Sequence, residues 1–379
     1  MKNIAIVHEW FVTYAGSEKV IEQLLYAFPE ADLFALVDFL PTNTRGFLGG
    51  RIVSTSFLQN FPFINLKNYR SYLPFMPLAV EQFDLSSYDI VFSNCHAVSK
   101  GVITSPDQLH ISYIHSPIRY AWDMQETYLS RSGFGKLKNI FARVLLHYIR
   151  NWDFSAAQRP DKLLANSNYI RRRVQKIYRR DATTFYPPVD TDYYIPGQTR
   201  EEYYLAASRL VPYKRLDLIL DAFRGMPEKK LVVIGDGPDA CVQMKNLPAN
   251  ITWLGYQPDD ILRDHMQRCK AFIFAAKEDF GIMPIEAQAC GAPVIAFGEG
   301  GLTETVRGLG TENPTGVFFH PQTADALREA VSIFEANRDK FPAGICRMNA
   351  ERFSNQRFRA EIRNIIETAW DTFERERHL

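Results

Sequence analysis

The most informative polar residues are two glutamates in the segment 278–286, EDFGIMPIE. The segment follows an expected strand and leads into an expected helix that has Pro284 near its first position, which places Glu278 in the loop and Glu286 in the first helical turn. Gly281 lets a ligand approach the backbone, and the free amides of a helix start bind anions or hydroxyls. A carboxylate that favours the helix dipole would explain Glu286 alone. The spacing therefore supports a ligand-binding pair and a helix-stabilising acid about equally.

Two cations bracket a short turn in the segment 208–214, SRLVPYK, directly after another expected strand. Arg209 offers a planar fork of donors and Lys214 a compact charge, a combination that suits a diphosphate. A solvated basic turn is the common alternative, and in isolation the pattern favours it.

A histidine stands at the end of each of two expected strands of the first half. His115, in YIHSP, either points out of its strand toward a ligand hydroxyl or is a loop residue whose hydrogen bonds are made within the protein. His8 has the same two interpretations. In the turn after His8, Gly16 and Ser17 precede a helix. They indicate either a phosphate-binding turn or an ordinary helix cap.

The segment 235–240, GDGPDA, fits the dinucleotide fingerprint G-x-G-x-x-A, with Asp259 about 20 residues further on. The match lies midway through the second half of the chain, however, and Pro238 shortens any helix start. NAD binding is therefore the weaker hypothesis for this segment.

The elements that position these residues alternate between strand and helix. Apolar runs that predict strands are 3–8, 33–37, 52–57, 89–93, 111–115, 205–208, 231–234, 251–254, 272–275 and 294–297. Helical spacing occurs at 17–28, 215–223, 259–268, 284–290 and 355–374. Such alternation, with nearly all-apolar strands, is typical of parallel sheets covered on both faces. We therefore predict an α/β fold with two doubly wound, Rossmann-like domains that face each other across a cleft, with ligands at the carboxyl ends of the strands.

The proline-rich segment 187–200, PPVDTDYYIPGQTR, predicts the boundary between the domains. We place the N-terminal domain at 1–190 and the C-terminal domain at 191–354, with a last helix at 355–379. A length of 379 residues fits two or three domains.

Composition excludes several classes of protein. The formal net charge is +1, which lacks the basic excess of a dedicated nucleic-acid binder. Neither a membrane-spanning run nor a signal peptide is recognisable. The five cysteines are scattered without a CxxC pair, so neither a zinc site nor a disulfide framework is expected, and a cytoplasmic location is the simplest interpretation.

The near-neutral total conceals a basic band. The window 131–180 holds thirteen basic residues and two acidic ones, with apolar and aromatic residues between them. Such a band suits anionic lipid headgroups, so we expect peripheral membrane contact through 131–180. The aromatic stretch 60–80 is either part of the same surface or a buried loop.

Taken together, the motifs resemble those of the retaining nucleotide-sugar glycosyltransferases of family 4, which have the GT-B fold. EDFGIMPIE is similar to the family's glutamate pair, SRLVPYK to its Arg and Lys, YIHSP to its N-domain histidine segment and FYPPVDTDYY to its interdomain linker. IGDGP is also a familiar strand and turn in that family. The first turn departs from the pattern, because Ala15 stands before Gly16 where many members have two glycines.

The resemblance implies that the domain at 1–190 is the acceptor side and the domain at 191–354 binds the nucleotide-sugar donor. It also implies a role for each motif. Arg209 and Lys214 would hold the donor diphosphate and stabilise the charge of the leaving group. Glu286 would accept hydrogen bonds from the ribose, and Glu278 would hold the donor sugar. The remaining donor contacts would come from the amides of Phe280, Gly281 and Ile282, from the backbone near Gly255 and Tyr256, and from Gly16 in the first domain. His115 would contact the sugar or assist at the reacting face, and the helix at 355–379 would cross back to the first domain.

The implied activity is transfer of a hexose of glucose or mannose type, with retention, from a UDP- or GDP-sugar to a saccharide acceptor. We expect a lipid-linked acceptor, in assembly of a bacterial-type surface or exopolysaccharide. No metal or other cofactor and no nucleic-acid partner are expected; the DTD of Asp190 and Asp192 lies in the linker. The alternatives are an NAD-dependent oxidoreductase using GDGPDA and a non-catalytic RNA-binding module.

Overall fold

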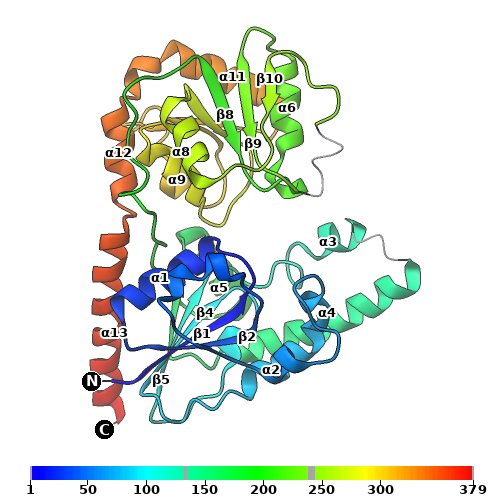
Figure 1. The fold of residues 1–379 in the computed structure, drawn as a ribbon, viewed down its shortest axis with the longest axis vertical. Coiled ribbons are helices and arrows are strands. Elements are labelled where there is room, and N and C mark those ends of the chain that lie inside the picture. The colour runs from blue at the N-terminus through cyan, green and yellow to red at the C-terminus, as the bar shows by residue number, and fades with distance from the viewer. Residues whose placement is uncertain (1, 132–134, 238–243, 378–379) are drawn as a thin grey trace. The chain divides into compact units, whose positions relative to one another are not determined.

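The computed structural model describes residues 2–131, 135–237 and 244–377. The chain divides into two compact units (Figure 1). Unit 1 consists of Met1–Pro187 together with Phe358–Leu379, and unit 2 consists of Pro188–Arg357. Each unit is built around one parallel sheet and is described by itself.

The sheet of unit 1 has seven strands in the order β3-β2-β1-β4-β5-β6-β7, all paired in parallel. The strands are β1 (Ile4–Phe11), β2 (Asp32–Asp38), β3 (Val53–Thr55), β4 (Ile90–Cys95), β5 (Leu109–Ile114), β6 (Lys162–Ala165) and β7 (Thr183–Thr184). The helices are α1 (Gly16–Ala27), α2 (Met76–Glu81), α3 (Gln125–Arg131), α4 (Lys136–Ala156), α5 (Asn168–Tyr178) and α13 (Asn355–Arg377). Short 3-10 helices are η1 (Thr42–Thr44), η2 (Gly46–Leu48), η3 (Phe57–Asn60), η4 (Tyr69–Phe75) and η5 (Ser99–Gly101).

Alternate residues of each strand of unit 1 face opposite sides of the sheet, as the pleat requires. Ile6 packs with residues of α1 and α13, whereas its neighbours Ala5 and Val7 pack with residues of α2. Phe358, in the first turn of α13, stacks on Phe185 with ring centroids 4.7 Å apart. The final helix is therefore part of the core of unit 1.

Unit 2 has a six-stranded parallel sheet in the order β10-β9-β8-β11-β12-β13. Its strands are β8 (Tyr203–Ala207), β9 (Lys230–Ile234), β10 (Ile251–Trp253), β11 (Ala271–Phe274), β12 (Val294–Phe297) and β13 (Gly316–Phe319). Its helices are α6 (Leu216–Arg224), α8 (Asp259–Arg268), α9 (Ile282–Ala289), α10 (Leu302–Thr305), α11 (Ala324–Ala336) and α12 (Ala343–Glu351), with η6 (Pro212–Lys214) and η7 (Arg338–Lys340). Residues of α6 and α11 share one core cluster with the sheet.

The strand order reverses at one place in each sheet. In unit 1 the chain builds outward from β1 to β3 and then returns to place β4 on the other side of β1. In unit 2 the same happens between β8 and β11. The loops that leave two such strands run in opposite directions, which leaves room for side chains and ligands at the carboxyl ends of the pair. The two reversal points are therefore where functional groups are expected.

The structure confirms the predicted α/β class with parallel sheets in both halves. It adds the strands β6, β7 and β13, which were not predicted, and it shortens the expected strand at 52–57 to β3, because η3 begins at Phe57. Cys95, Cys269, Cys290 and Cys346 are buried free thiols, and Cys241 lies outside the described residues. No helix in the described part of the chain is long and apolar enough to span a membrane.

A buried histidine in β5 makes the stability of unit 1 depend on pH. His110 is fully buried and its Nε2 lies 2.9 Å from the hydroxyl of Ser93. Burial, together with the charges of Arg159 and Arg180, lowers the pKa of His110 to about 3. The unfolded chain binds a proton at this residue below about pH 6.5, whereas the folded state does not, so lowering the pH favours unfolding.

We expect this residue to remove about 1.4 kcal/mol of unfolding free energy for each pH unit between 6.5 and 4. Urea titrations at several pH values measure the slope. His110→Gln should reduce the slope by about one proton, whereas the same change at the exposed His147 should leave it as in wild type. An unchanged slope in His110→Gln would show that another group causes the acid sensitivity.

Candidate functional site

A salt bridge joins the loops that follow β8 and β11 at the reversal point of unit 2. Lys214 Nζ lies 2.6 Å from Glu278 Oε1, and the side chains are only 15% and 13% exposed. The ammonium also lies 5.2 Å from the ring centroid of Phe274 and 5.3 Å from that of Tyr213. Two of the residues singled out from sequence, 64 positions apart, are thus in direct contact.

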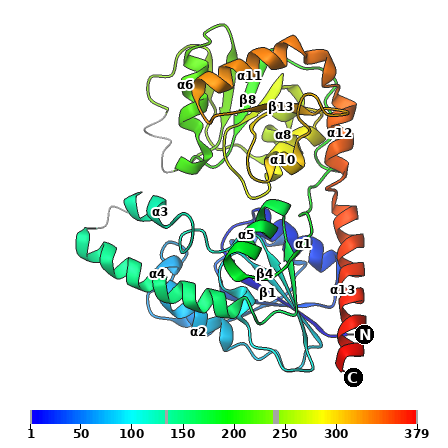
Figure 2. The same ribbon diagram turned by 180° about the vertical axis from the view of Figure 1, so that it is seen from behind.

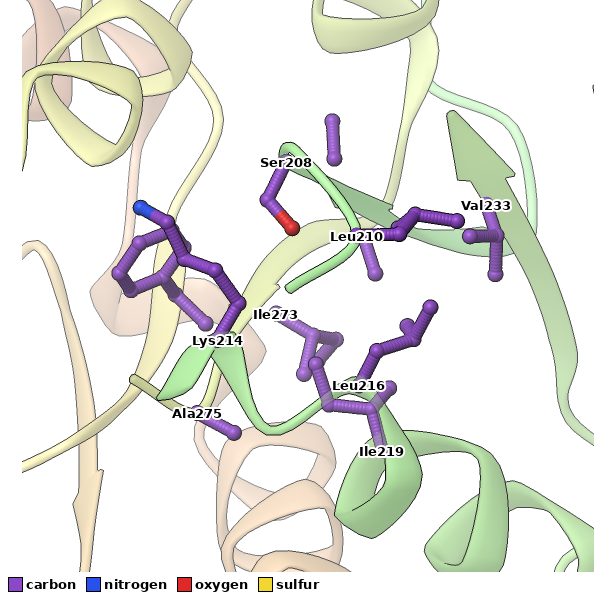
Figure 3. A pocket seen from close by; sticks show the side chains of 11 residues that line it. Ser208, Leu210, Lys214, Leu216, Ile219, Val233, Ile273 and Ala275 are labelled. Carbon is purple, nitrogen blue, oxygen red and sulfur yellow. The ribbon is translucent and has the colours of Figure 1, made fainter. Parts of the chain in front are cut away.

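A small pocket lies next to this pair (Figure 3). It is formed by the ends of β8, β9 and β11 and by the start of α6, and most of its lining is apolar, including Leu210, Leu216 and Ile273. Ser208 and Lys214 supply polar groups to the lining. Apolar surroundings strengthen the electrostatic interactions of the lysine with any anion that reaches it.

The loop between β11 and α9 depends on three glycines. Gly281 caps α9 with φ +95°, a backbone conformation that other residues rarely adopt. The loop after β12 then packs backbone against backbone on it, since Gly301 N donates to Glu278 O at 2.8 Å. A Cβ at Gly300 would lie 2.3 Å from Glu278 O. The sequence analysis did not identify Gly300 and Gly301, although GEGG directly after a strand is a visible signal.

The first turn of α9 presents amides close to Glu278. α9 begins at Ile282, so the amides of Ile282 and Met283 have no partners within the helix, and Pro284 has no N–H. Phe280 is buried with its ring edge-on to Phe353 at 5.5 Å. The Phe280 side chain therefore anchors the loop between β11 and α9 against Phe353.

The expected position of Glu286 in the first helical turn is wrong. Since α9 begins at Ile282, Glu286 stands in the second turn, and it is buried. It does not serve as an exposed acid at the helix start. Burial, together with the charge of Glu286, raises the pKa of Tyr194, which places this tyrosine of the 188–200 segment close to the carboxylate.

The other two residues expected on the donor side do not join the Lys214–Glu278 pair. Arg209 lies in the same loop as Lys214 but is exposed, and its guanidinium forms no hydrogen bond or ion pair with the described residues. Tyr256 follows β10 and is 75% exposed, next to Gly255 with φ +70°. Both side chains are free to move toward a ligand.

The dinucleotide-like segment has a structural role. Gly235 has φ +135°, and a Cβ there would lie 1.9 Å from Ser208 O. A Cβ at Gly237 would lie 2.2 Å from Leu210 O. The two glycines let the loop after β9 lie directly on the loop that carries Arg209. Residues 238–240 of GDGPDA lie outside the described residues.

A hydrogen-bonded row of polar side chains occupies the reversal point of unit 1. The Asn94 side-chain amide donates to His8 Nδ1 at 3.2 Å, and its oxygen accepts from His115 Nε2 at 2.7 Å. His8 Nε2 in turn donates to Glu18 at 3.1 Å. With the amide in this orientation, Nδ1 of a neutral His115 keeps its lone pair. Burial, aided by the charges of His96 and His8, lowers the pKa of His115 well below its ordinary value.

The first turn places a carboxylate where sequence suggested a phosphate. α1 begins at Gly16, and its N-cap is Ala15 instead of Ser17. The carboxylate of Glu18 accepts from the Ala15 amide and the Ser17 hydroxyl, each at 3.0 Å. Burial would raise the pKa of Glu18, but the hydrogen bond and charge of His8 bring it below its ordinary value. An ionised carboxylate at this helix start opposes the approach of an anion, so the phosphate contact of Gly16 remains a prediction.

A second buried carboxylate fixes the loop after β4. Glu9 accepts hydrogen bonds from the amides of His96, Ala97, Val98 and Ser99 at 2.8–3.1 Å. Burial opposes its ionisation, but the charge of His96 and these amides lower the pKa of Glu9 below its ordinary value. Sequence reasoning missed Glu9 and Asn94. Glu9 reaches the loop after β4, and Asn94 lies opposite His8, only because β1 and β4 are neighbours. Among the described residues no group of three or more His, Cys, Asp or Glu side chains could hold a metal ion.

Part of the chain is similar in sequence to known proteins. Residues 195–350 match the family model described as "Glycosyl transferases group 1". The D-inositol 3-phosphate glycosyltransferase of Mycobacterium leprae is 28% identical over 172 residues, which are 39% of this chain and 40% of that protein. That of Mycobacterium tuberculosis strain F11 is 26% identical over 219 residues, 51% of this chain and 46% of that protein. The chain therefore matches less than half the length of each of these relatives.

Solved structures resemble the chain over nearly its whole length. Anabaena HepE, in complex with UDP and glucose, has a TM-score of 0.66 at 16% identity and covers 97% of this chain and 100% of its own. Sucrose-phosphate synthase from Thermosynechococcus elongatus has a TM-score of 0.70 at 15% identity, with coverages of 98% and 100%. The fold is accordingly that of GT-B glycosyltransferase structures, two Rossmann-like α/β domains.

The backbone contact between the β8 and β9 loops predicts a strong effect of one methyl group. Gly235→Ala places a Cβ against Ser208 O and strains the backbone, so we expect the unfolding free energy to fall by roughly 3 kcal/mol. Chemical denaturation measures the change. Gly344→Ala is the matched control, since nothing lies within 4 Å of a Cβ there. Equal stability of the two variants would contradict the assigned contact.

Proposed function

We propose that this protein is a glycosyltransferase that uses a nucleotide-sugar donor, bound at the reversal point of unit 2. The observation that carries the proposal is the Lys214–Glu278 pair, in which a cation suited to a diphosphate lies 2.6 Å from a carboxylate suited to sugar hydroxyls. Both residues lie within the segment that matches the glycosyltransferase family model. The first-turn amides of α9 support the same assignment.

The donor is proposed to be a UDP- or GDP-hexose of glucose or mannose type. Lys214 and Arg209 bind the diphosphate and stabilise the charge that develops as it leaves. Glu278 and the amides at the start of α9 hold the sugar ring, Glu286 binds the ribose, and the base lies beside Tyr256. HepE, which was solved with UDP and with UDP-glucose, has the same fold and supports a uridine donor.

The acceptor is proposed to be a saccharide bound by unit 1. The neutral His115 keeps a lone pair on Nδ1, which suits a contact with a sugar hydroxyl. The reaction retains the anomeric configuration, as in family 4, with the leaving phosphate accepting the proton of the acceptor hydroxyl while the new glycosidic bond forms on the same face. No metal takes part. A lipid-linked acceptor in polysaccharide assembly, used in the cytoplasm at the inner face of the membrane, completes the proposal.

The first experiment tests the site with purified full-length chain and a panel of UDP- and GDP-sugars. Lys214→Ala and Glu278→Ala should each lower the rate of donor hydrolysis or transfer by about a hundredfold or more, because each removes a group that contacts the reacting donor. Lys277→Ala is the matched control, since this exposed lysine lies in the loop that carries Glu278 and pairs with Glu299, which follows β12. Full activity in both site variants would contradict the site. Product NMR reports whether the configuration is retained.

The salt bridge itself predicts a difference between donor and product. In Glu278→Gln, Lys214 loses the carboxylate that competes with the diphosphate, so binding of UDP without a sugar should tighten by about fivefold, the equivalent of roughly 1 kcal/mol. Binding of the UDP-sugar should tighten less, because the sugar loses its carboxylate. Isothermal titration calorimetry measures both affinities. Weaker binding of UDP in this variant would show that Glu278 does not compete with the diphosphate for Lys214.

Two other functions stay open to the same screen. An NAD-dependent oxidoreductase would be stabilised by NAD in a thermal-shift assay, and an RNA-binding module would be stabilised by RNA. The structural use of Gly235 and Gly237 in loop packing supports neither. Stabilisation by NAD or by RNA, with none by any nucleotide sugar, would replace the proposed function.

A further inference from the structure

The solvent side of α4 is apolar over three turns. Leu137, Ile140, Phe141, Val144 and Tyr148 recur at the spacing of one helix face, and they are 49% to 81% exposed. A surface helix normally presents charged and polar residues to solvent. This set, which we name the α4 ridge, therefore calls for a partner that buries it.

The opposite side of α4 anchors the helix to unit 1. Leu146 and Ile149 are buried there. One turn further on, the buried Asp153 pairs with Lys100 and accepts hydrogen bonds from Trp122 Nε1 at 2.7 Å and from Tyr178 at 2.9 Å. The ridge cannot turn inward without breaking this buried charge pair. Figure 2 shows α4 running along the edge of unit 1.

The basic band of the sequence is not a single face in the structure. Five of its thirteen basic side chains are held by partners within unit 1: Arg143 by Glu126, Arg159 by Glu81, Arg173 by Asp123, and Arg150 and Arg180 by backbone carbonyls. Arg171, Arg172 and Lys176 are exposed on α5, a different helix. Arg143 lies within the ridge span and is exposed, but it is paired with Glu126. Lys136 and Lys138 are the exposed cations without such a pair among the described residues that lie closest along the chain to the ridge.

These two lysines lie on either side of the ridge. At 100° per residue, Lys136 and Lys138 project from the helix on opposite sides of Leu137. Both are exposed, and neither has a hydrogen-bond or ion-pair partner among the described residues. Long lysine side chains in this position can keep their charge among headgroup phosphates while their stems lie along apolar surface.

More exposed apolar side chains belong to the neighbouring part of unit 1. Leu73 of η4 packs in the same cluster as Leu146 and Ile149 of α4, so η4 lies beside the helix. Phe75, at the end of η4, is 44% exposed, and Phe63, in the loop before it, is 89% exposed. The stretch 60–80, which the sequence left undecided, therefore contains both core residues and exposed aromatic ones.

We propose that the α4 ridge inserts into the interface of an anionic lipid bilayer, with Lys136 and Lys138 against the lipid phosphates. A convex apolar ridge on one helix, flanked by lysines and bearing the aromatic residues Phe141 and Tyr148, suits the headgroup–acyl boundary. The helix lies on the membrane and does not span it. This inference does not depend on the transfer reaction.

The test uses the full-length chain and vesicles of phosphatidylcholine with or without phosphatidylglycerol. Phosphatidylglycerol at about 30% of the lipid gives the vesicles a clear negative surface potential. Co-sedimentation measures the partition coefficient at low salt. The ridge variant carries Leu137→Ser, Phe141→Ser and Val144→Ser. The lysine variant carries Lys136→Gln and Lys138→Gln, and its matched control removes two exposed charges from α5 with Arg171→Gln and Arg172→Gln.

We expect wild type to bind anionic vesicles, the ridge variant to lose binding by about tenfold or more, and the lysine variant to lose about three- to tenfold. The α5 control should bind like wild type. Because the ridge is exposed, the circular dichroism and melting temperature of its variant should match those of wild type. The proposal would be overturned if wild type bound the anionic vesicles no better than the ridge variant does. It would also be overturned if only the α5 control lost binding. Self-association of wild type that the ridge variant abolishes, without vesicle binding, would identify a second copy of the chain as the partner.

Discussion

The buried carboxylate of Glu9 is the constraint on which the polar layer of unit 1 depends. Removing an ionised group from water costs several kcal/mol unless hydrogen bonds replace the water. Four consecutive amides of the loop after β4 supply them, at 2.8–3.1 Å. The loop is thereby fixed against the end of β1. Asn94, which the row from Glu18 through His8 to His115 requires, lies in β4 directly before this loop.

Unit 2 meets the same topological requirement with different chemistry. Its loops at the reversal point are held by close backbone contacts, which only glycine permits at Gly235, Gly237 and Gly300. Because glycine has no side chain, the loops after β8, β9, β11 and β12 can lie close together. The Lys214–Glu278 pair is the result, a polar contact built by parts of the chain that share no sequence signal. A buried carboxylate thus orders the loops at the carboxyl ends of the sheet in unit 1. Glycine residues order the corresponding loops in unit 2.

The distribution of charge changes meaning once the structure is known. A net charge of +1 conceals the dense basic window at 131–180, but that window does not form one face. Several of its arginines stabilise unit 1 through ion pairs and backbone carbonyls, where a planar guanidinium makes several bonds at once. What remains unusual about α4 is apolar exposure. The buried Lys100–Asp153 pair holds α4 in place while its hydrophobic residues face the solvent. An exposed apolar surface of this kind indicates contact with a partner.

The sequence by itself determined the parallel α/β class, most of its strands and some of its helices, because apolar runs and helical spacing are local consequences of burial. Helices such as α4, α5, α11 and α12 were not predicted. It also identified Lys214 and Glu278 as separate candidates, since residue type and position after a strand are local signals. Tertiary structure alone decided that these two meet, that Glu286 is buried in the second turn of α9, and that Glu18 occupies the first helix start. It also revealed Glu9, Asn94 and Gly300. The physical reason is that strand order determines which loops become neighbours, and neither spacing nor composition encodes contacts between residues many positions apart.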